Sequence, residues 1–138
     1  MASGVPVSDD CLLKFQELRQ QRKFKYIVFT LNPTNSEIIV EKTSSSNNYE
    51  DFTNDLPQAE CKWAVYDLEF EKDGAKRNKI CFFSWSPDNA KIKQKMVFAS
   101  SRDGLRRRLD GIHVEIQGTE PSEVEYEAVL AKASSGTR

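Results

Sequence analysis

The chain has 138 residues, about the length of one domain. Its 20 lysine and arginine residues nearly balance 21 aspartate and glutamate residues, and this formal net charge of −1 argues against a uniformly basic protein that wraps nucleic acid. Hydrophobic residues make up 38% of the chain, enough for one core, while no apolar run approaches the roughly 20 residues that span a bilayer. Asp9 and Asp10 lie where a secretory signal would be apolar. We therefore expect one cytoplasmic domain over residues 1–138 without a transmembrane segment.

Hydrophobic periodicity and turn residues predict the elements in chain order. They are a helix over 9–21, strands over 24–31 and 37–42, a short helix over 49–56, strands over 61–71 and 77–85, a helix over 90–109, a strand over 112–117 and a helix over 120–133. This order predicts an α+β fold, a single-domain mixed β-sheet of about five strands flanked by helices on both faces. Outside the elements we expect a flexible N-terminal arm over about residues 1–7 and a frayed tail over about residues 134–138.

The predicted helix over 90–109 concentrates positive charge. Residues 91–108 carry seven basic residues and one acidic residue, whereas residues 115–127 carry five glutamates and no basic residue. Such a stripe favours an acidic partner surface or anionic lipid heads, and a solvated helix face is the alternative.

Apolar residues interrupt this stripe. Ile92 and Met96 lie among the lysines, a pattern that suits a protein interface as well as a core. Because the apolar spacing slips near Ser100 and Gly104, we expect a kink or a restart of the helix there.

The remaining chemical signals are weak. A second basic cluster, Lys76, Arg77 and Lys79, lies on the predicted hairpin, where solubility and protection of a sheet edge are alternatives to binding. Common phosphate-loop, dinucleotide, serine-hydrolase and zinc-protease motifs are missing from the sequence. We expect no metal site and no cofactor. The single histidine, His113, should be structural or exposed. The widely spaced cysteines should be buried, reduced thiols; they are Cys11, Cys61 and Cys81.

Several longer motifs are recognisable together. WSPD at 85–88 and IKQKMVFASS at 92–101 continue into RDGLRR at 102–107, and MASGV at 1–5, YEDF at 49–52 and AVYD at 64–67 accompany them. These segments closely resemble the signature of the ADF/cofilin family of actin-depolymerising proteins, and the resemblance covers nearly the whole chain.

The resemblance implies an ADF-homology fold without enzymatic activity. It also implies a protein that binds actin monomers and filaments, prefers the ADP state, and severs and depolymerises filaments to raise actin turnover. A monomer associated with the cytoskeleton is expected, with transport into the nucleus left open. A member that binds monomers or filament sides without severing is the alternative. A nucleic-acid binder is a rival from another class, but only Phe98 lies near the stripe as a stacking group, so we expect no nucleic-acid partner.

The resemblance also assigns residues to sites. The surface for both monomers and filaments would comprise Ser3, Gly4, Val5, Ile92, Lys93, Lys95, Met96, Arg102 and Asp103. A contact with filaments only would use Arg77, Lys79 and Lys132. A phosphoinositide site that competes with actin would use Lys93, Lys95, Arg102, Arg106 and Arg107.

Regulation and departures from the family pattern concern a few positions. Ser3 matches a regulatory phosphorylation position, where a phosphate would add about −1.5 to −2 charge and be repelled by acidic actin. A small residue without that role is the alternative.

Lys91 stands where many members have proline, and Ala131 stands where several have an acidic residue, which weakens the last-helix part of the filament contact. His113 is one residue away from a histidine linked to pH response, so pH sensitivity is left open.

Overall fold

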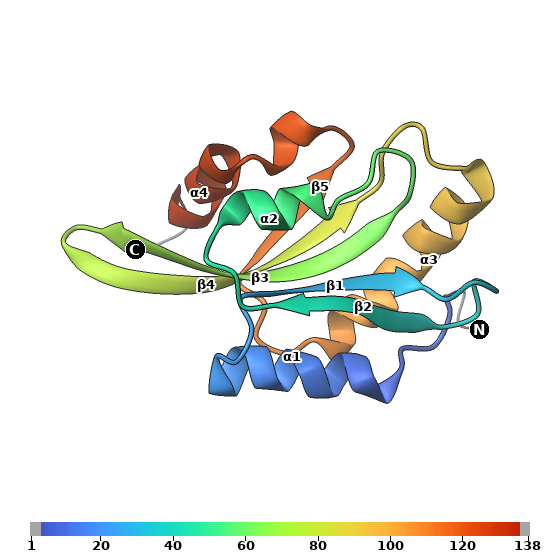
Figure 1. Cartoon of the computed structure of the whole chain (residues 1–138), viewed down its shortest axis with the longest axis horizontal. Coiled ribbons are helices and arrows are strands. Elements are labelled where there is room, and N and C mark those ends of the chain that lie inside the picture. The colour runs from blue at the N-terminus through green and yellow to red at the C-terminus, as the bar shows by residue number, and fades with distance from the viewer. Residues whose placement is uncertain (1–3, 136–138) are drawn as a thin grey trace.

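The computed structural model describes residues 4–135 as a mixed sheet between helices (Figure 1). Its elements are α1 (Asp9–Gln21), β1 (Tyr26–Leu31), β2 (Ile38–Ser44), α2 (Tyr49–Asn54), β3 (Lys62–Lys72), β4 (Ala75–Trp85), α3 (Ile92–Arg108), β5 (Val114–Gly118), the 3-10 helix η1 (Pro121–Val124) and α4 (Tyr126–Ser135). The five strands are ordered β2-β1-β3-β4-β5. Only β4 and β5 pair in parallel among these neighbours, so the predicted α+β fold with a mixed sheet is confirmed.

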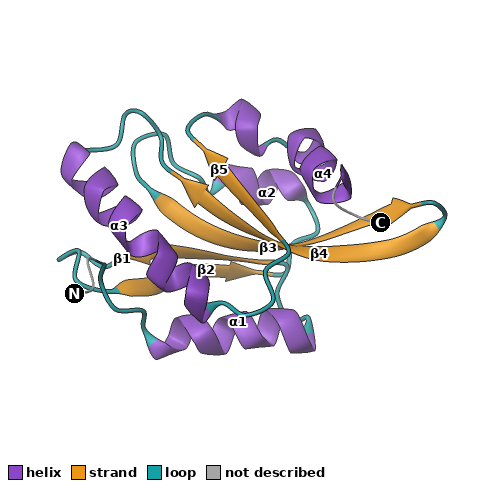
Figure 2. Ribbon diagram, turned by 180° about the vertical axis from the view of Figure 1, so that it is seen from behind, coloured by secondary structure: helices purple, strands orange, loops and turns teal. Residues whose placement is uncertain are grey.

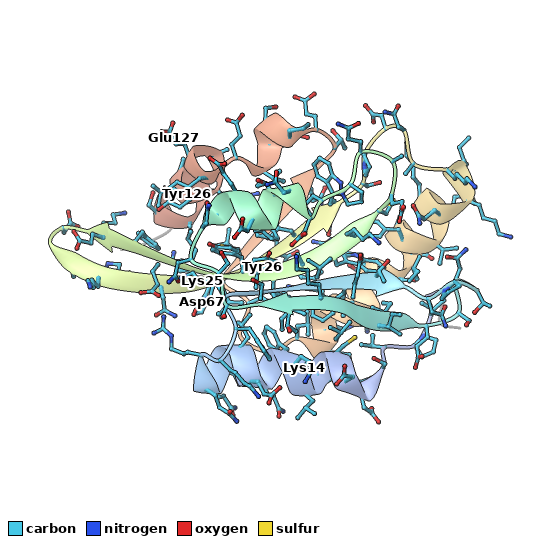
Figure 3. All side chains as sticks on the ribbon, in the orientation of Figure 1. Lys14, Lys25, Tyr26, Asp67, Tyr126 and Glu127 are labelled. Atoms are coloured by element: carbon cyan, nitrogen blue, oxygen red, sulfur yellow. The ribbon has the colours of Figure 1, made fainter. Side chains whose placement is uncertain are left out.

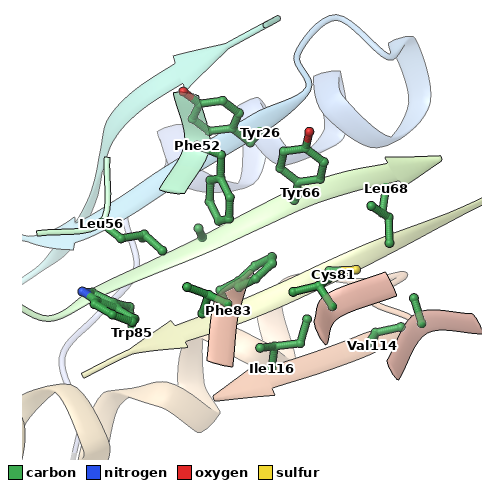
Figure 4. Close-up of a cluster of buried hydrophobic side chains, with 14 of the residues drawn as sticks. Tyr26, Phe52, Leu56, Tyr66, Leu68, Cys81, Phe83, Trp85, Val114 and Ile116 are labelled. Carbon is green, nitrogen blue, oxygen red and sulfur yellow. The ribbon is translucent and has the colours of Figure 1, made fainter. Parts of the chain in front are cut away.

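Alternate side chains of the strands build two cores, because successive residues of a strand point to opposite faces. On β3, Ala64, Tyr66 and Leu68 join the cluster beneath α2 and α4 (Figure 4). Trp63 and Val65 point to the other face, which α1 and α3 cover (Figure 2). Each face of the sheet carries its own apolar set, so the predicted helices on both faces are confirmed.

Helix α3 explains the slipped apolar spacing. Its buried residues are Phe98, Ser101 and Leu105, and the Phe98 ring stacks on Trp63 with centroids 4.1 Å apart. Met96 lies on a different side of the helix and is exposed. The change in apolar spacing along α3 therefore reflects two separate groups of apolar side chains, one that faces the sheet and one that faces solvent. The helix continues from Ile92 to Arg108, so the predicted restart is wrong.

The C-terminal helix begins later than predicted. The residues after β5 form η1, in which Glu120 and Glu123 make a reciprocal capping box and Pro121 occupies the first turn. Glu125 is extended, with φ −63° and ψ 152°, and α4 begins at Tyr126. The predicted single helix over 120–133 is therefore wrong, because this extended residue separates two helical segments.

Both ends of the described chain are attached to the domain. The Ile38 amide donates to the Pro6 carbonyl at 2.9 Å, and the Ser8 amide donates to the Ile38 carbonyl at the same distance. These bonds hold residues 6–8 against β2, in place of the arm expected up to residue 7. At the other end α4 includes Ser134 and Ser135, so the frayed tail does not begin at 134. The rest of the arm and tail predictions, residues 1–3 and 136–138, lies outside the described residues.

Candidate functional site

The outward face of α3 exposes two apolar side chains between cations. Ile92 is 76% exposed and Met96 is 67% exposed, and Lys93 is exposed beside them. Lys95 is half-buried, and its ammonium donates to the Asp88 carbonyl at 2.9 Å, a bond that fixes the start of the helix without neutralising the charge. Large apolar groups that face solvent and are rimmed by charge are typical of a protein-binding surface.

The N-terminal segment lies directly on α3. A Cβ atom added at Gly4 would come within 2.8 Å of the Ser100 carbonyl oxygen and of the Ser101 Cα, so only glycine fits this close approach. The Val5 amide then donates to the Ser101 hydroxyl at 3.2 Å. The structure thus brings together Gly4, Val5 and α3, which the sequence assigned to one surface. Ser3, assigned to the same surface and to phosphorylation, lies outside the described residues.

Glu115 on β5 restrains two of the predicted ligand-binding arginines. Its carboxylate forms an ion pair with Arg102 and accepts from the Arg106 Nε at 2.9 Å. Arg102 also contacts Asp103 at 3.0 Å and lies with its guanidinium carbon 6.0 Å from the centre of the Phe82 ring. Arg102 therefore packs against the sheet and is committed to neighbours within the domain.

Sequence reasoning missed Glu115, although a signal was present. Val114 and Ile116 on the same strand are buried toward α2 and α4, so Glu115 between them points to the α3 side. A carboxylate on that side of an edge strand meets the basic helix. Among the cations assigned to phosphoinositides, Lys93 and Arg107 are exposed, at opposite ends of α3.

The residues assigned to filament contact lie on the outer half of the β3–β4 hairpin and on α4 beside it. In the β3–β4 register, Arg77 lies opposite Phe70 and Lys79 lies opposite Leu68, so both basic residues share the α4 side of the hairpin. The Lys79 ammonium donates to the Ala133 carbonyl in the last turn of α4 at 2.8 Å. The neighbouring Lys132 is exposed on α4. The structure therefore brings the three predicted residues to one end of the molecule.

The single histidine bonds to the backbone of the sheet, and the three cysteines are buried. The His113 Nδ1 accepts from the Ile80 amide at 2.9 Å, and the His113 amide donates to the Ile80 carbonyl, which secures the start of β5 beside β4. Cys11, Cys61 and Cys81 are all buried and free, as predicted. Burial raises the pKa of the Cys81 thiol to about 12, so this thiol is neutral at ordinary pH.

Within residues 4–135, no three histidine, cysteine, aspartate or glutamate side chains come together in a metal-binding arrangement. Over the same residues, none of the helices combines the length and apolar character needed to cross a bilayer.

Comparison with known proteins gives consistent matches. The family model for cofilin/tropomyosin-type actin-binding protein matches residues 4–134. A cofilin from Mycosarcoma maydis is 61% identical over 99% of both chains, and a cofilin from Saccharomyces cerevisiae is 47% identical over 97% of this chain and 95% of its own.

Solved structures agree with the sequence comparison. The crystal structure of Streptomyces griseoflavus cofilin has a TM-score of 0.92 and 58% identity over 96% of this chain and 99% of its own. The crystal structure of Plasmodium berghei actin depolymerization factor 2 has a TM-score of 0.86 and 29% identity over 97% of this chain and 99% of its own. With a family model matched over nearly its whole length and relatives of such identity, the chain belongs to the cofilin/ADF family of actin-binding proteins.

Proposed function

We propose that this protein binds both monomeric and filamentous actin, prefers the ADP state, and severs and depolymerises filaments. The observation that carries the proposal is the outward face of α3, where Ile92 and Met96 are exposed among lysines and the segment at Gly4 lies alongside. Exposed apolar anchors with a cationic rim suit a partner that offers an apolar cleft with acidic edges. Membership of an actin-binding family supports actin as that partner.

Severing needs no catalytic group in this proposal. A protein that binds one state of a filament more tightly than another shifts the filament toward the favoured state by the difference in binding free energy. Where decorated and bare stretches meet, the two states adjoin, and the filament breaks there. Binding to filament sides or monomers without severing is the alternative, which the same experiment distinguishes.

The proposal assigns two surfaces different tasks. The α3 surface with the N-terminal segment contacts both monomers and filaments, and Arg77, Lys79 and Lys132 add a contact that only a filament provides. Support for the second surface is the position of these residues at one projecting end of the molecule, away from α3 (Figure 1).

Two controls of activity belong to the same proposal. Phosphoinositide headgroups compete with actin for the basic residues of α3, because anionic lipids attract each exposed cation near the membrane surface. A phosphate on Ser3 would bring negative charge to the segment that adjoins α3, and acidic actin would repel it. Association with the cytoskeleton in the cytoplasm is the expected location.

The test is co-sedimentation with ADP-actin filaments, with imaging of filament length on the same sample. Since Lys95 and Lys79 make contacts within the domain, single charge reversals at Lys93 and Arg77 are the cleaner variants. We expect Lys93→Glu to weaken monomer and filament binding together, and Arg77→Glu to weaken filament binding alone.

The results of these assays distinguish severing from binding without severing, and two contact surfaces from one. Pelleting with fragmentation at partial decoration supports severing, whereas pelleting without fragmentation supports the alternative. Equal effects of the two variants on monomers and filaments would show that the two-surface assignment is wrong. A wild-type protein that binds neither form of actin would refute the proposed function.

A further inference from the structure

The outer half of the β3–β4 hairpin has little support from the rest of the sheet. Pairing of β1 with β3 ends at Tyr66, and pairing of β5 with β4 begins at Cys81. The Asp67 amide still donates to the Lys25 carbonyl, and Ile80 still bonds to His113. From the pair Leu68 and Lys79 outward to the turn, the two strands pair only with each other, as the projecting ribbon in Figure 1 shows. A two-stranded ribbon is marginally stable alone in water, so other contacts must fix its direction.

Apolar packing holds the α4 side of this ribbon, whereas on the opposite side Glu69 forms ion pairs with Arg22 and Lys25 at 3.2 and 3.3 Å. Leu68 and Phe70 of β3 are buried in the same cluster as Val129 and Ala133 of α4. Beyond Phe70 the ribbon has no further buried apolar side chain. Beyond this packing, the outer ribbon makes polar contacts with α4.

Two lysines of the ribbon reach the same helix terminus. The Lys72 ammonium donates to the Ser134 carbonyl at 2.6 Å, and the Lys79 ammonium donates to the Ala133 carbonyl at 2.8 Å. The last carbonyls of a helix have no partner within the helix, and the negative end of its dipole attracts cations. Both lysines are partly buried, which strengthens a charged hydrogen bond relative to one in water.

We propose that Lys72 and Lys79 are positioning residues that fasten the ribbon to the C-terminal turn of α4. This contact, the lysine clasp, sets the direction of Arg77 on the ribbon relative to Lys132 on the helix. The inference rests on the proposed filament contact, which draws on both elements. With the clasp in place, the two cations meet a filament as one surface; without it, the filament must order the ribbon and binds more weakly.

Lys72 gives the cleaner test, because no filament contact is assigned to it. Lys72→Met keeps the length of the side chain and removes the donor, whereas Lys72→Arg keeps a cationic donor. Lys76→Met is the matched control, since Lys76 lies on the same ribbon, is exposed, and pairs with Glu71 on the side of the ribbon that faces away from α4. Each methionine variant removes one positive charge from the same hairpin.

The experiment measures three quantities for the full chain: co-sedimentation with ADP-actin filaments, binding to ADP-actin monomers, and amide hydrogen exchange of residues 69–78. We expect Lys72→Met to weaken filament binding about tenfold, the effect of one charged hydrogen bond, with monomer binding unchanged. Exchange in the ribbon should become faster. Lys72→Arg should retain filament binding, and Lys76→Met should leave exchange unchanged.

Several results would overturn the clasp. One is an equal loss of filament binding in Lys72→Met and Lys76→Met, which would mean that charge alone matters. Another is an unchanged exchange rate in Lys72→Met, and a third is the same loss in Lys72→Arg as in Lys72→Met. If the wild-type protein does not bind filaments, the proposed function fails, while the exchange measurement still decides whether the clasp holds the ribbon.

Discussion

Neutralising Glu115 should strengthen binding to phosphoinositide membranes. The carboxylate of Glu115 forms ion pairs with Arg102 and Arg106, so it occupies two of the five cations assigned to lipid headgroups. The variant Glu115→Gln removes one negative charge beside the arginines of α3 that we propose bind lipid headgroups, while keeping the shape of the side chain. The freed guanidinium groups can then turn toward an anionic surface.

The expected gain follows from the charge. One elementary charge near an anionic membrane is worth about 1 kcal/mol, which corresponds to about fivefold in affinity. The ion pairs are partly exposed, with side-chain exposures of 24% for Arg102, 38% for Glu115 and 30% for Arg106. Each pair of this kind contributes about 0.2 to 1 kcal/mol to stability, so the variant should remain folded.

The assay is binding to phosphatidylcholine vesicles that contain phosphatidylinositol 4,5-bisphosphate, compared at about 0.1 M and about 1 M salt, where screening lengths are about 10 Å and 3 Å. The matched control is Glu127→Gln on α4, where Glu127 is exposed and projects away from the sheet (Figure 3). We expect the Glu115 variant alone to gain affinity, and the gain to vanish at high salt. A gain of equal size in both variants, or none in Glu115→Gln, would refute the reasoning.

Three further perturbations have defined outcomes. Gly4→Ala should displace the N-terminal segment from Ser101 and weaken actin-monomer binding, with a melting temperature close to that of the wild type. Tyr49→Phe removes a 2.6 Å hydrogen bond from the Tyr49 hydroxyl to the Val124 carbonyl, and should cost about 1 kcal/mol, read as a lower midpoint in urea unfolding. The pKa of Cys81 is raised from 9.0 to about 12 by burial, so the folded state holds a proton that the unfolded state releases between these values. The free energy of unfolding should therefore be retained below pH 9 and fall above it, by up to about 1.4 kcal/mol per pH unit from this group, with a shallower fall in Cys81→Ala.

Each of these outcomes can fail in a specific way. A Gly4→Ala protein that binds monomers as well as the wild type would show that the close approach to α3 is unimportant for binding. An unchanged urea midpoint in Tyr49→Phe would mean that the hydroxyl contributes nothing net. If Cys81→Ala and the wild type lose stability equally between pH 9 and 12, the buried thiol is not a source of the alkaline destabilisation.

Local patterns in the sequence determined the elements and their order. Aromatic and β-branched residues along the segment at 61–71 identified a strand, and helical spacing after Ser8 identified α1, because both signals depend on residues a few positions apart. The family signature also pointed to Ile92, Lys93 and the N-terminal segment as one surface. The last helix was misplaced because the capping box of η1 and the extended backbone of Glu125 are local features that the spacing of apolar residues does not reveal.

The tertiary structure decided which side of each element meets the domain. The sequence left Met96 open to a core or an interface role, since two apolar sets share α3, and only the packing of Phe98 on Trp63 turned Met96 to solvent. The ion pairs of Glu115 and the clasp at Lys72 join segments far apart in the chain. Such contacts depend on the order of strands in the sheet and on how the helices pack on it, and no local spacing encodes either.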